Sequence, residues 1–351
     1  MKKIILITGS CGLVGSEAVS FFCNKNFKVI GIDNNYRKKL FGEDGDNKKI
    51  NARLKKFNNF KNYRIDIRNF EKLKKIFLKY KFHSIIHAAA QPSHDWAVKK
   101  PFVDFGINAL ATLNLLELTR KFCNNAKFVY VSTNKVYGDR PNNINLKELN
   151  MRWDVNQSSK FYKGIDEKMS IDNSTHSLFG VSKTSADLLV QEYSNNFGLK
   201  SVVFRAGCIT GPNHAGAELH GFLNYLVKCF IVNKKYTIFG YKGKQVRDNI
   251  HSYDLVNAFW HFIKAPTKKF NIFNIGGGRK NSCSILEIIK IIEKKINIKL
   301  NYTISKKNRV GDHKWYITDN SRFSSTYKSW KIKYNLSSII DQIIGSYISK
   351  N

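Results

Sequence analysis

Short runs of apolar and β-branched residues alternate with longer stretches of helical periodicity along the first 205 residues. The short runs predict six strands, at residues 4–8, 28–33, 63–65, 84–87, 128–132 and 202–205. Four longer helices are predicted between them, at residues 13–24, 70–80, 102–123 and 178–197. Strands that alternate with helices are typical of βαβ units, so the pattern predicts an α/β fold with a doubly wound parallel sheet.

Charge and cysteine content narrow the class of protein. The net charge is +33, but only 12 of the 59 basic residues are Arg, and the Lys residues are spread along the chain. This spread indicates compositional drift, so we expect no nucleic-acid partner. The six cysteines form no C-x-x-C pair, which predicts neither a disulfide framework nor a zinc site and favours a reducing cytoplasm. No apolar run of about 18 residues occurs, so no membrane segment is predicted.

A glycine-rich turn, Gly9-Ser-Cys-Gly12-Leu13-Val14-Gly15, joins the first predicted strand to the first predicted helix. Glycines at these positions allow a tight turn and let backbone amides approach a pyrophosphate at the helix N-terminus. The second strand ends in Asp33, followed by Asn34, where a carboxylate can bind both hydroxyls of the adenosine ribose. An acid there would repel a 2′-phosphate, so the turn predicts an NAD site; the nearby Arg37 keeps NADP as an alternative.

Regular alternation stops after Arg205, and glycine-rich and aromatic segments follow. We therefore expect two domains. The Rossmann-type NAD-binding domain comprises residues 1–205 and 249–276, and a smaller C-terminal substrate-binding lobe comprises residues 206–248 and 277–351. The Lys-rich segment at 37–58 is predicted to be a long solvated insertion.

The three-residue spacing of the glycines resembles the extended short-chain dehydrogenases/reductases that modify nucleotide sugars, the NAD-dependent epimerase/dehydratase family. Matching segments follow in the same order over nearly the whole chain. The resemblance implies that Asp66 and Ile67 meet the adenine and that Ala88, Ala89 and Ala90 line the dinucleotide after strand four. Asn108 corresponds to the family's helix asparagine.

The fifth predicted strand runs into Val131-Ser132-Thr133-Asn134-Lys-Val-Tyr137-Gly138, which is similar to the family's active-site turn. Ser132 is thereby expected to face the cofactor, Asn134 the substrate, and Thr133 to hydrogen-bond the reacting sugar oxygen. The family's next signature is Tyr-x-x-x-Lys on a helix, in which the lysine holds the ribose and lowers the pKa of the tyrosine base. Here the segment contains Phe179 and Lys183, so the lysine is present and the phenol is not.

Loss of the phenol removes a proton relay worth about two to four orders of magnitude in rate. Three explanations stay open. Another group substitutes for it, with Lys183, Thr133, Tyr137 and Cys208 as candidates; or the phenylalanine is an engineered change that traps substrate; or the protein binds its ligands without turnover.

Two arginines match family positions that grip the substrate diphosphate. They are Arg247, in the segment 245–254, and Arg309, in Arg309-Val-Gly-Asp312. Paired guanidinium groups suit a pyrophosphate because their charge-assisted bonds are bidentate. His94 follows strand four on the loop where the family places the sugar, so it is a candidate for binding sugar hydroxyls. No metal site is predicted.

Within the family, the turn 132–139, the segment 240–254 and the Arg309 motif most resemble the CDP-paratose 2-epimerases, also called tyvelose epimerases. The resemblance implies NAD-dependent inversion of C2 of a CDP-sugar through a transient keto sugar, in polysaccharide biosynthesis. Alternatives are a nucleotide-sugar 4-epimerase or 4,6-dehydratase, although a dehydratase typically has Asp-Glu beside the threonine, where Asn134-Lys135 stands. A catalytically silent protein that binds NAD and a nucleotide sugar is an alternative of another class. The expected assembly is a homodimer or homotetramer formed through the helices at 102–123 and 178–197.

Overall fold

The computed structural model describes residues 2–214, 216, 221–266, 271–307 and 311–348. The chain forms two compact units. Unit 1 consists of Met1–Val136, Leu178–Arg205 and Leu255–Phe273, and unit 2 of Tyr137–Ser177, Ala206–Asp254 and Asn274–Asn351. Unit 2 therefore includes residues 137–177, 249–254 and 274–276, which the sequence led us to expect in the cofactor domain. Backbone pairing within unit 2 accounts for this difference, since the Trp153 N–H donates to the Lys244 carbonyl at 3.0 Å.

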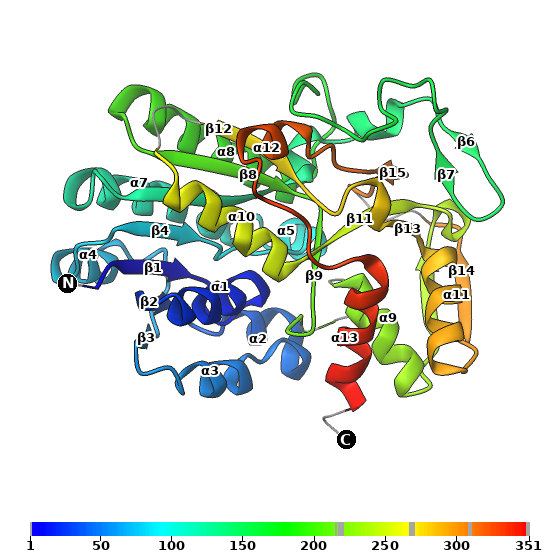
Figure 1. Cartoon of the computed structure of the whole chain (residues 1–351), viewed down its shortest axis with the longest axis horizontal. Helices are drawn as coiled ribbons and strands as arrows, with labels where there is room; N and C mark the ends of the chain where they lie inside the picture. Colours follow the sequence, from blue (N-terminus) through cyan, green and yellow to red (C-terminus); the bar gives the residue numbers. More distant parts are fainter. Residues whose placement is uncertain (1, 215, 217–220, 267–270, 308–310, 349–351) are drawn as a thin grey trace. The chain divides into compact units, whose positions relative to one another are not determined.

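A seven-stranded sheet forms the centre of unit 1 within the described residues (Figure 1). The strand order is β12-β8-β5-β4-β1-β2-β3, and the pairs from β5 through β3 are parallel. The strands are β1 (Ile4–Thr8), β2 (Lys28–Ile32), β3 (Phe60–Tyr63), β4 (Ser84–His87), β5 (Lys127–Thr133), β8 (Ser201–Ala206) and β12 (Asn271–Ile275). The direction of winding reverses between β1 and β4, which is where a doubly wound sheet binds its ligand. The predicted fold class is confirmed.

Helices cover both faces of this sheet. Alternate strand residues such as Leu6 and Ile85 pack with α4 (Phe70–Lys79), α7 (Ala111–Phe122) and α8 (Leu178–Phe197) in one apolar core. Ile5 and Ile7 point to the opposite face and are also fully buried. On that side Phe22 of α1 (Leu13–Asn24) contacts Trp260 of α10 (Ser252–Lys264), with ring centroids 6.2 Å apart. Burial on both faces explains why the strands appear in the sequence as continuous apolar runs.

Several elements differ from the prediction. The third strand lies at Phe60–Tyr63, earlier than expected, because it pairs with β2 in the register Val29↔Phe60. The expected helix at 102–123 is divided into α6 (Pro101–Phe105), a π-helical turn η2 (Gly106–Leu110) and α7. The expected solvated insertion contains α2 (Tyr36–Phe41), a 3-10 turn η1 (Gly42–Gly45) and α3 (Lys48–Leu54). The last residue of α3, Leu54, is fully buried, so this segment is part of the fold.

The described part of unit 2 is built from smaller sheets and from helices that share an apolar core. Strand β11 (Val246–His251) pairs with β9 (Cys208–Thr210), β13 (Ser282–Ser284) and β15 (Trp315–Tyr316), while β10 (Tyr236–Phe239) pairs with β14 (Tyr302–Ser305) and β6 (Lys147–Glu148) with β7 (Trp153–Asp154). Helices α9 (Phe222–Ile231), α11 (Ile285–Ile296) and α13 (Leu336–Ile348) share an apolar core. α11 begins with a capping box between Ser284 and Glu287, and α12 (Ser321–Thr326) is short. None of the described helices is long and apolar enough to span a bilayer.

Candidate cofactor and substrate sites

The glycine turn lies between β1 and α1, at the winding reversal of the sheet. Gly9 has φ +66°, and a Cβ there would lie 2.8 Å from the Cα of Ala89. A Cβ at Gly15 would lie 1.9 Å from the Gly9 carbonyl oxygen, so both positions require glycine. α1 begins at Leu13, and its N-cap Gly12 makes no side-chain hydrogen bond. Because no side chain caps this end, the first backbone N–H groups, including that of Val14, suit a pyrophosphate.

Asp33 is held beside this turn by three hydrogen bonds. Its Oδ2 accepts the N–H of Cys11 at 2.9 Å, within the glycine turn itself. Its Oδ1 accepts the N–H of Asn35 at 2.8 Å and the side-chain amide of Asn47 at 3.0 Å. A carboxylate has about four acceptor sites, so capacity remains for ribose hydroxyls. The geometry therefore fits the predicted adenosine ribose site.

Asn34 and Arg37, which were expected at the cofactor beside Asp33, both make contacts within the protein. The side-chain oxygen of Asn34 accepts the N–H of Tyr36 at 3.0 Å and so shapes the start of α2. Burial lowers the pKa of Arg37 to about 10, so the group still carries its charge near neutral pH. Its guanidinium carbon lies 4.8 Å from the ring centroid of Phe41.

The adenine-side residues follow β3 and β4. Asp66 accepts two hydrogen bonds from the guanidinium of Arg68, at 3.0 and 2.7 Å, and the neighbouring Ile67 is buried. Ala88 and Ala89 are half-buried, and Ala90 is exposed. Backbone atoms of Ala88 and Ala89 lie within 3.0 Å of the place that a Cβ of Gly9 would occupy, so these two alanines border the glycine turn.

Asn108 lies in the π-helical turn η2, and its amide is engaged within the protein. Its Oδ1 accepts the N–H of Gln91 at 2.9 Å. Its Nδ2 is within hydrogen-bond distance of the Gln91 carbonyl, the Asp104 carboxylate and the Ser182 hydroxyl, at 3.0 to 3.1 Å. Asn108 is 1% exposed, so it ties the loop after β4 to α8 and has the place of a positioning residue.

Ser132 and Thr133, at the end of β5, carry neighbouring hydroxyl groups with different surroundings. Ser132 is buried and donates to the carboxylate of Asp187 at 2.7 Å. Thr133 is half-buried, and its Oγ1 accepts the N–H of Lys135 at 3.2 Å and lies 3.4 Å from the Asn134 side-chain oxygen. Of these two hydroxyls, Thr133 is the one with access to a ligand.

Lys183 has an unusual environment for a lysine. The side chain is 4% exposed, and its Nζ donates to the Val131 carbonyl at 2.8 Å and lies 4.4 Å from the ring centroid of Tyr130. Burial lowers the pKa of Lys183 to about 7, although the carboxylates of Asp187 and Asp104 oppose the shift. The ammonium and the free amine are therefore both populated near neutral pH.

Phe179 stands in the first turn of α8, four residues before Lys183 and on the same helical face. The ring is 7% exposed, so it is packed as a core residue. Its neighbour is His94, the first residue of α5 (His94–Lys99), with ring centroids 4.8 Å apart and ring planes at 57°. The contact between these two rings was not expected from the sequence, because 85 residues separate them.

Two of the candidate replacement groups lie in unit 2. Tyr137 is fully buried, and its hydroxyl donates to the side-chain oxygen of Asn274 at 2.7 Å. This engaged phenol fits a structural role better than that of a base. Cys208 is half-buried on β9, where its Cα is paired with that of Asn249 on β11.

Arg247 lies on β11 and is 7% exposed. One Nη donates to its own chain, to the Val246 carbonyl at 2.6 Å, and the other forms an ion pair with Asp312. The second expected diphosphate ligand, Arg309, lies outside the described residues. Of the two arginines expected to bind the diphosphate, the described residues thus include Arg247, whose guanidinium is already paired with a carboxylate.

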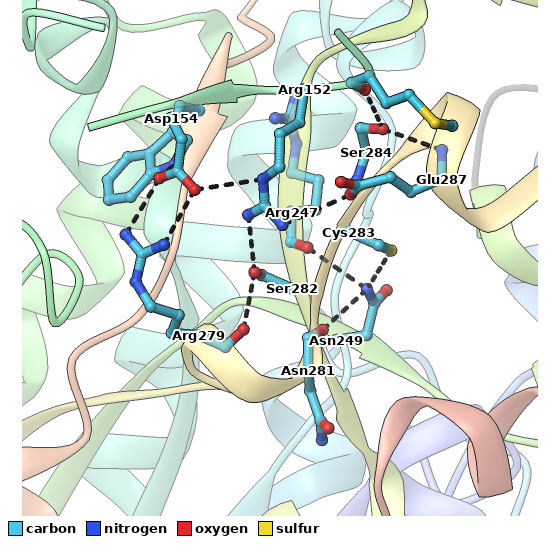
Figure 2. A network of polar contacts seen from close by, with 12 residues as sticks. Arg152, Asp154, Arg247, Asn249, Arg279, Asn281, Ser282, Cys283, Ser284 and Glu287 are labelled. Carbon is cyan, nitrogen blue, oxygen red and sulfur yellow. Dashed lines mark hydrogen bonds and ion pairs between the residues drawn. The ribbon is translucent and has the colours of Figure 1, made fainter. Parts of the chain in front are cut away.

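Sequence reasoning missed a second arginine cluster in unit 2 (Figure 2). Arg279 makes two hydrogen bonds to Asp154, at 2.9 and 3.1 Å, and Arg152 lies on the other side of the same carboxylate at 3.3 Å. Arg152 also donates to Ser282 at 2.9 Å, and its Nη1 lies 3.5 Å from Glu287. The cluster joins β7 to β13 and α11. No local spacing signals it, because its members come from segments more than 120 residues apart.

Comparisons with known proteins agree with this architecture. Residues 5–276 match the family model described as "NAD dependent epimerase/dehydratase family". The chain is 33% identical to the CDP-paratose 2-epimerase of Salmonella typhi over 325 residues, which cover 90% of each chain. It is 32% identical to the UDP-glucuronate 4-epimerase of Thermodesulfobacterium geofontis over 294 residues, covering 84% of this chain and 81% of that one.

A solved structure shows the same fold. The crystal structure of the UDP-glucuronic acid 4-epimerase from Bacillus cereus, in complex with UDP-glucuronic acid and NAD, superposes with a TM-score of 0.81 at 24% identity, covering 99% of this chain and 100% of that one. The family expected from the glycine turn, and NAD as its cofactor, are confirmed by the family match. The chain belongs to the NAD dependent epimerase/dehydratase family.

Proposed function

We propose that the protein is a nucleotide-sugar epimerase that inverts C2 of a CDP-sugar through a transient keto sugar. The observation that carries this proposal is the 33% identity to a CDP-paratose 2-epimerase over 90% of both chains. The glycine turn, the anchored Asp33 and the buried Lys183 support it, because they fit a bound dinucleotide. When bound, NAD accepts a hydride from the sugar carbon and later returns it.

Thr133 and Lys183 act at the reacting end of the cofactor site in this proposal. The half-buried hydroxyl of Thr133 hydrogen-bonds the sugar oxygen that becomes a carbonyl. A protonated Lys183 has three donors, of which one meets the Val131 carbonyl. The remaining two can hold ribose hydroxyls, which fixes the cofactor without a phenol at position 179.

Arg247 is the proposed ligand of the substrate diphosphate. Its ion pair with Asp312 holds the guanidinium on β11 before substrate arrives. A diphosphate has to compete with this carboxylate, so the pair supports orientation more than affinity. We include Arg309 in the same role on the strength of its motif.

Two alternatives have a specific observation in their favour. The 32% identity to a UDP-glucuronate 4-epimerase supports reaction at C4 of a different nucleotide sugar. Phe179 supports a protein that binds NAD and sugar without turnover. A 4,6-dehydratase is disfavoured, because Asn134 and Lys135 follow Thr133 where an Asp-Glu acid/base pair is typical.

The decisive experiment begins with release and identification of the bound nucleotide. CDP-, UDP-, GDP- and dTDP-sugars carrying deuterium at C2 or at C4 are then incubated with the holoenzyme, and configuration is followed by NMR. We expect inversion at C2 of a CDP-sugar, slowed by deuterium at C2 and not at C4. Slowing by deuterium at C4 would favour the 4-epimerase. Binding of sugars with no inversion of any would favour the silent protein.

We also propose that the protein works as a homodimer or homotetramer. Large apolar side chains are exposed on neighbouring elements of unit 1: Phe102, Phe105, Leu110, Leu178, Val181 and Leu188. Contiguous exposed apolar side chains mark association surfaces in soluble proteins. Light scattering after size-exclusion chromatography tests this, with the double substitution Phe102→Ser/Val181→Ser expected to yield monomer. The proposed compartment is a reducing cytoplasm, consistent with six free cysteines.

A further inference from the structure

The ring of Phe179 packs against an imidazole. The rings of His94 and Phe179 have centroids 4.8 Å apart. His94 is half-buried, so it is partly accessible to a ligand, whereas Phe179 is 7% exposed. An imidazole, which can accept and donate a proton, therefore lies against the ring that lacks the family's phenol.

Hydrogen bonds hold the segment that leads into α5, whose first residue is His94. Gln91 accepts the N–H of Ser93 at 2.5 Å and donates to the Ser93 carbonyl at 2.8 Å. The same amide donates to the buried carboxylate of Asp104 at 2.6 Å. Ser93 in turn caps α5 by accepting the N–H of Trp96 at 3.3 Å. These bonds fix the backbone on both sides of His94.

The same network continues to the turn of α8 that contains Phe179. The N–H of Gln91 donates to Asn108, and Asn108 donates to Ser182 at 3.0 Å. Ser182 donates to the carbonyl of Phe179 at 3.1 Å. Gln91, Asn108 and Ser182 are each at most 1% exposed. Buried hydrogen bonds thus connect the segment before His94 to the turn of α8 that contains Phe179, and they set the relative position of the two rings.

Other candidates for the proton relay are less suited by their surroundings. Tyr137 is fully buried with its hydroxyl bonded to Asn274. Lys183 donates to the Val131 carbonyl, and the proposed function assigns its other two donors to the ribose. A threonine hydroxyl such as that of Thr133 relays a proton but does not store one near neutral pH. An imidazole can both accept and return a proton in that range.

We propose that His94 is the catalytic acid–base of the epimerase, in the role for which Phe179 has no hydroxyl; this inference rests on the proposed function. The imidazole takes the proton of the sugar C2 hydroxyl while the C2–H bond breaks and its electron pair leaves as hydride to NAD. A C2 carbonyl forms. On return, the hydride adds to the other face of C2, and His94 gives its proton back to the oxygen, so the protein and cofactor are regenerated.

The test compares four proteins as NAD-loaded holoenzymes: wild type, His94→Gln, His94→Gln/Phe179→Tyr and the control His83→Gln. His83 is half-buried in the same unit, just before β4, with its Nδ1 2.7 Å from Ser84 Oγ. We expect H94Q to lower kcat by about 10²- to 10⁴-fold without loss of bound NAD or a change in sugar KM. We expect H83Q to keep the wild-type kcat and the double variant to regain activity, because the added phenol restores a relay.

Each outcome is informative. An active wild type with an equally active H94Q would overturn the assignment of His94 and leave the proposed function standing. A raised KM at unchanged kcat would make His94 a binding residue and equally overturn it, as would a slow H94Q that the second substitution does not rescue. A wild type that inverts no sugar would overturn both proposals.

A readout independent of turnover is the NMR titration of the His94 ring, identified by its absence in H94Q. Helices α6 and α8 pack against α5. Their titratable groups are Asp104 of α6 and Lys183, Asp187, Glu192 and Tyr193 of α8, and α5 itself also carries Asp95 and Lys99. We expect addition of the sugar nucleotide to shift the titration of His94, since its imidazole then meets the C2 hydroxyl. A titration that does not respond to the sugar would contradict the proposal.

Discussion

Restoring the phenol with Phe179→Tyr measures how much proton transfer the protein already performs. The substitution adds one hydroxyl to a ring that is 7% exposed, lies against His94 and shares a helical face with Lys183. A buried phenol needs a hydrogen-bond partner, and His94 and Lys183 can each provide one. If no side chain substitutes for the missing base, the new phenol supplies about 10²- to 10⁴-fold in kcat, equivalent to about 3–5 kcal/mol of activation free energy.

We expect a much smaller gain, of about tenfold or less, because an existing acid–base leaves little of that free energy to recover. The assay is inversion at C2 of the deuterated sugar by the NAD-loaded enzyme, measured as kcat with saturating substrate. Phe161→Tyr, on a half-buried ring in unit 2, is the matched control for the chemical change. A gain of about a thousandfold or more would refute the idea of a substitute base and assign the natural chain to binding without turnover.

Gly15→Ala should lower NAD affinity by about tenfold or more, because its Cβ would lie 1.9 Å from the Gly9 carbonyl; calorimetric titration of NAD measures this. Asp187→Asn should destabilise the fold by about 3–5 kcal/mol, since it leaves Arg205 buried without its charge partner. Urea unfolding checks it, with the exposed Asp341→Asn expected to cost less than about 1 kcal/mol. Lys183 has a folded-state pKa of about 7, below its usual value, so the unfolded state binds more protons above pH 7 and stability should rise with pH there. In Lys183→Met that rise should disappear, and a rise of the same size in both proteins would contradict the assigned pKa.

The sequence determined those features that depend on local pattern. Local patterns predicted β1, β4, α1 and α8 at the ends the structure gives them, since a strand buried on both faces leaves a continuous apolar run and a helix leaves a 3.6-residue period. The glycine spacing identified the phosphate turn, because Gly9 and Gly15 occupy places where a Cβ has no room. Position 179 could likewise be recognised from its distance of four residues to Lys183.

Tertiary structure decided what depends on contacts between distant segments. The cluster of Arg152, Asp154 and Arg279, and the engagement of Tyr137 by Asn274, arise from pairings that have no sequence period. The lowered pKa of Lys183 follows from burial, which one segment cannot reveal by itself. The sequence showed that a phenol is missing; only the folding of the loop after β4 onto α8 brings the imidazole of His94 against Phe179.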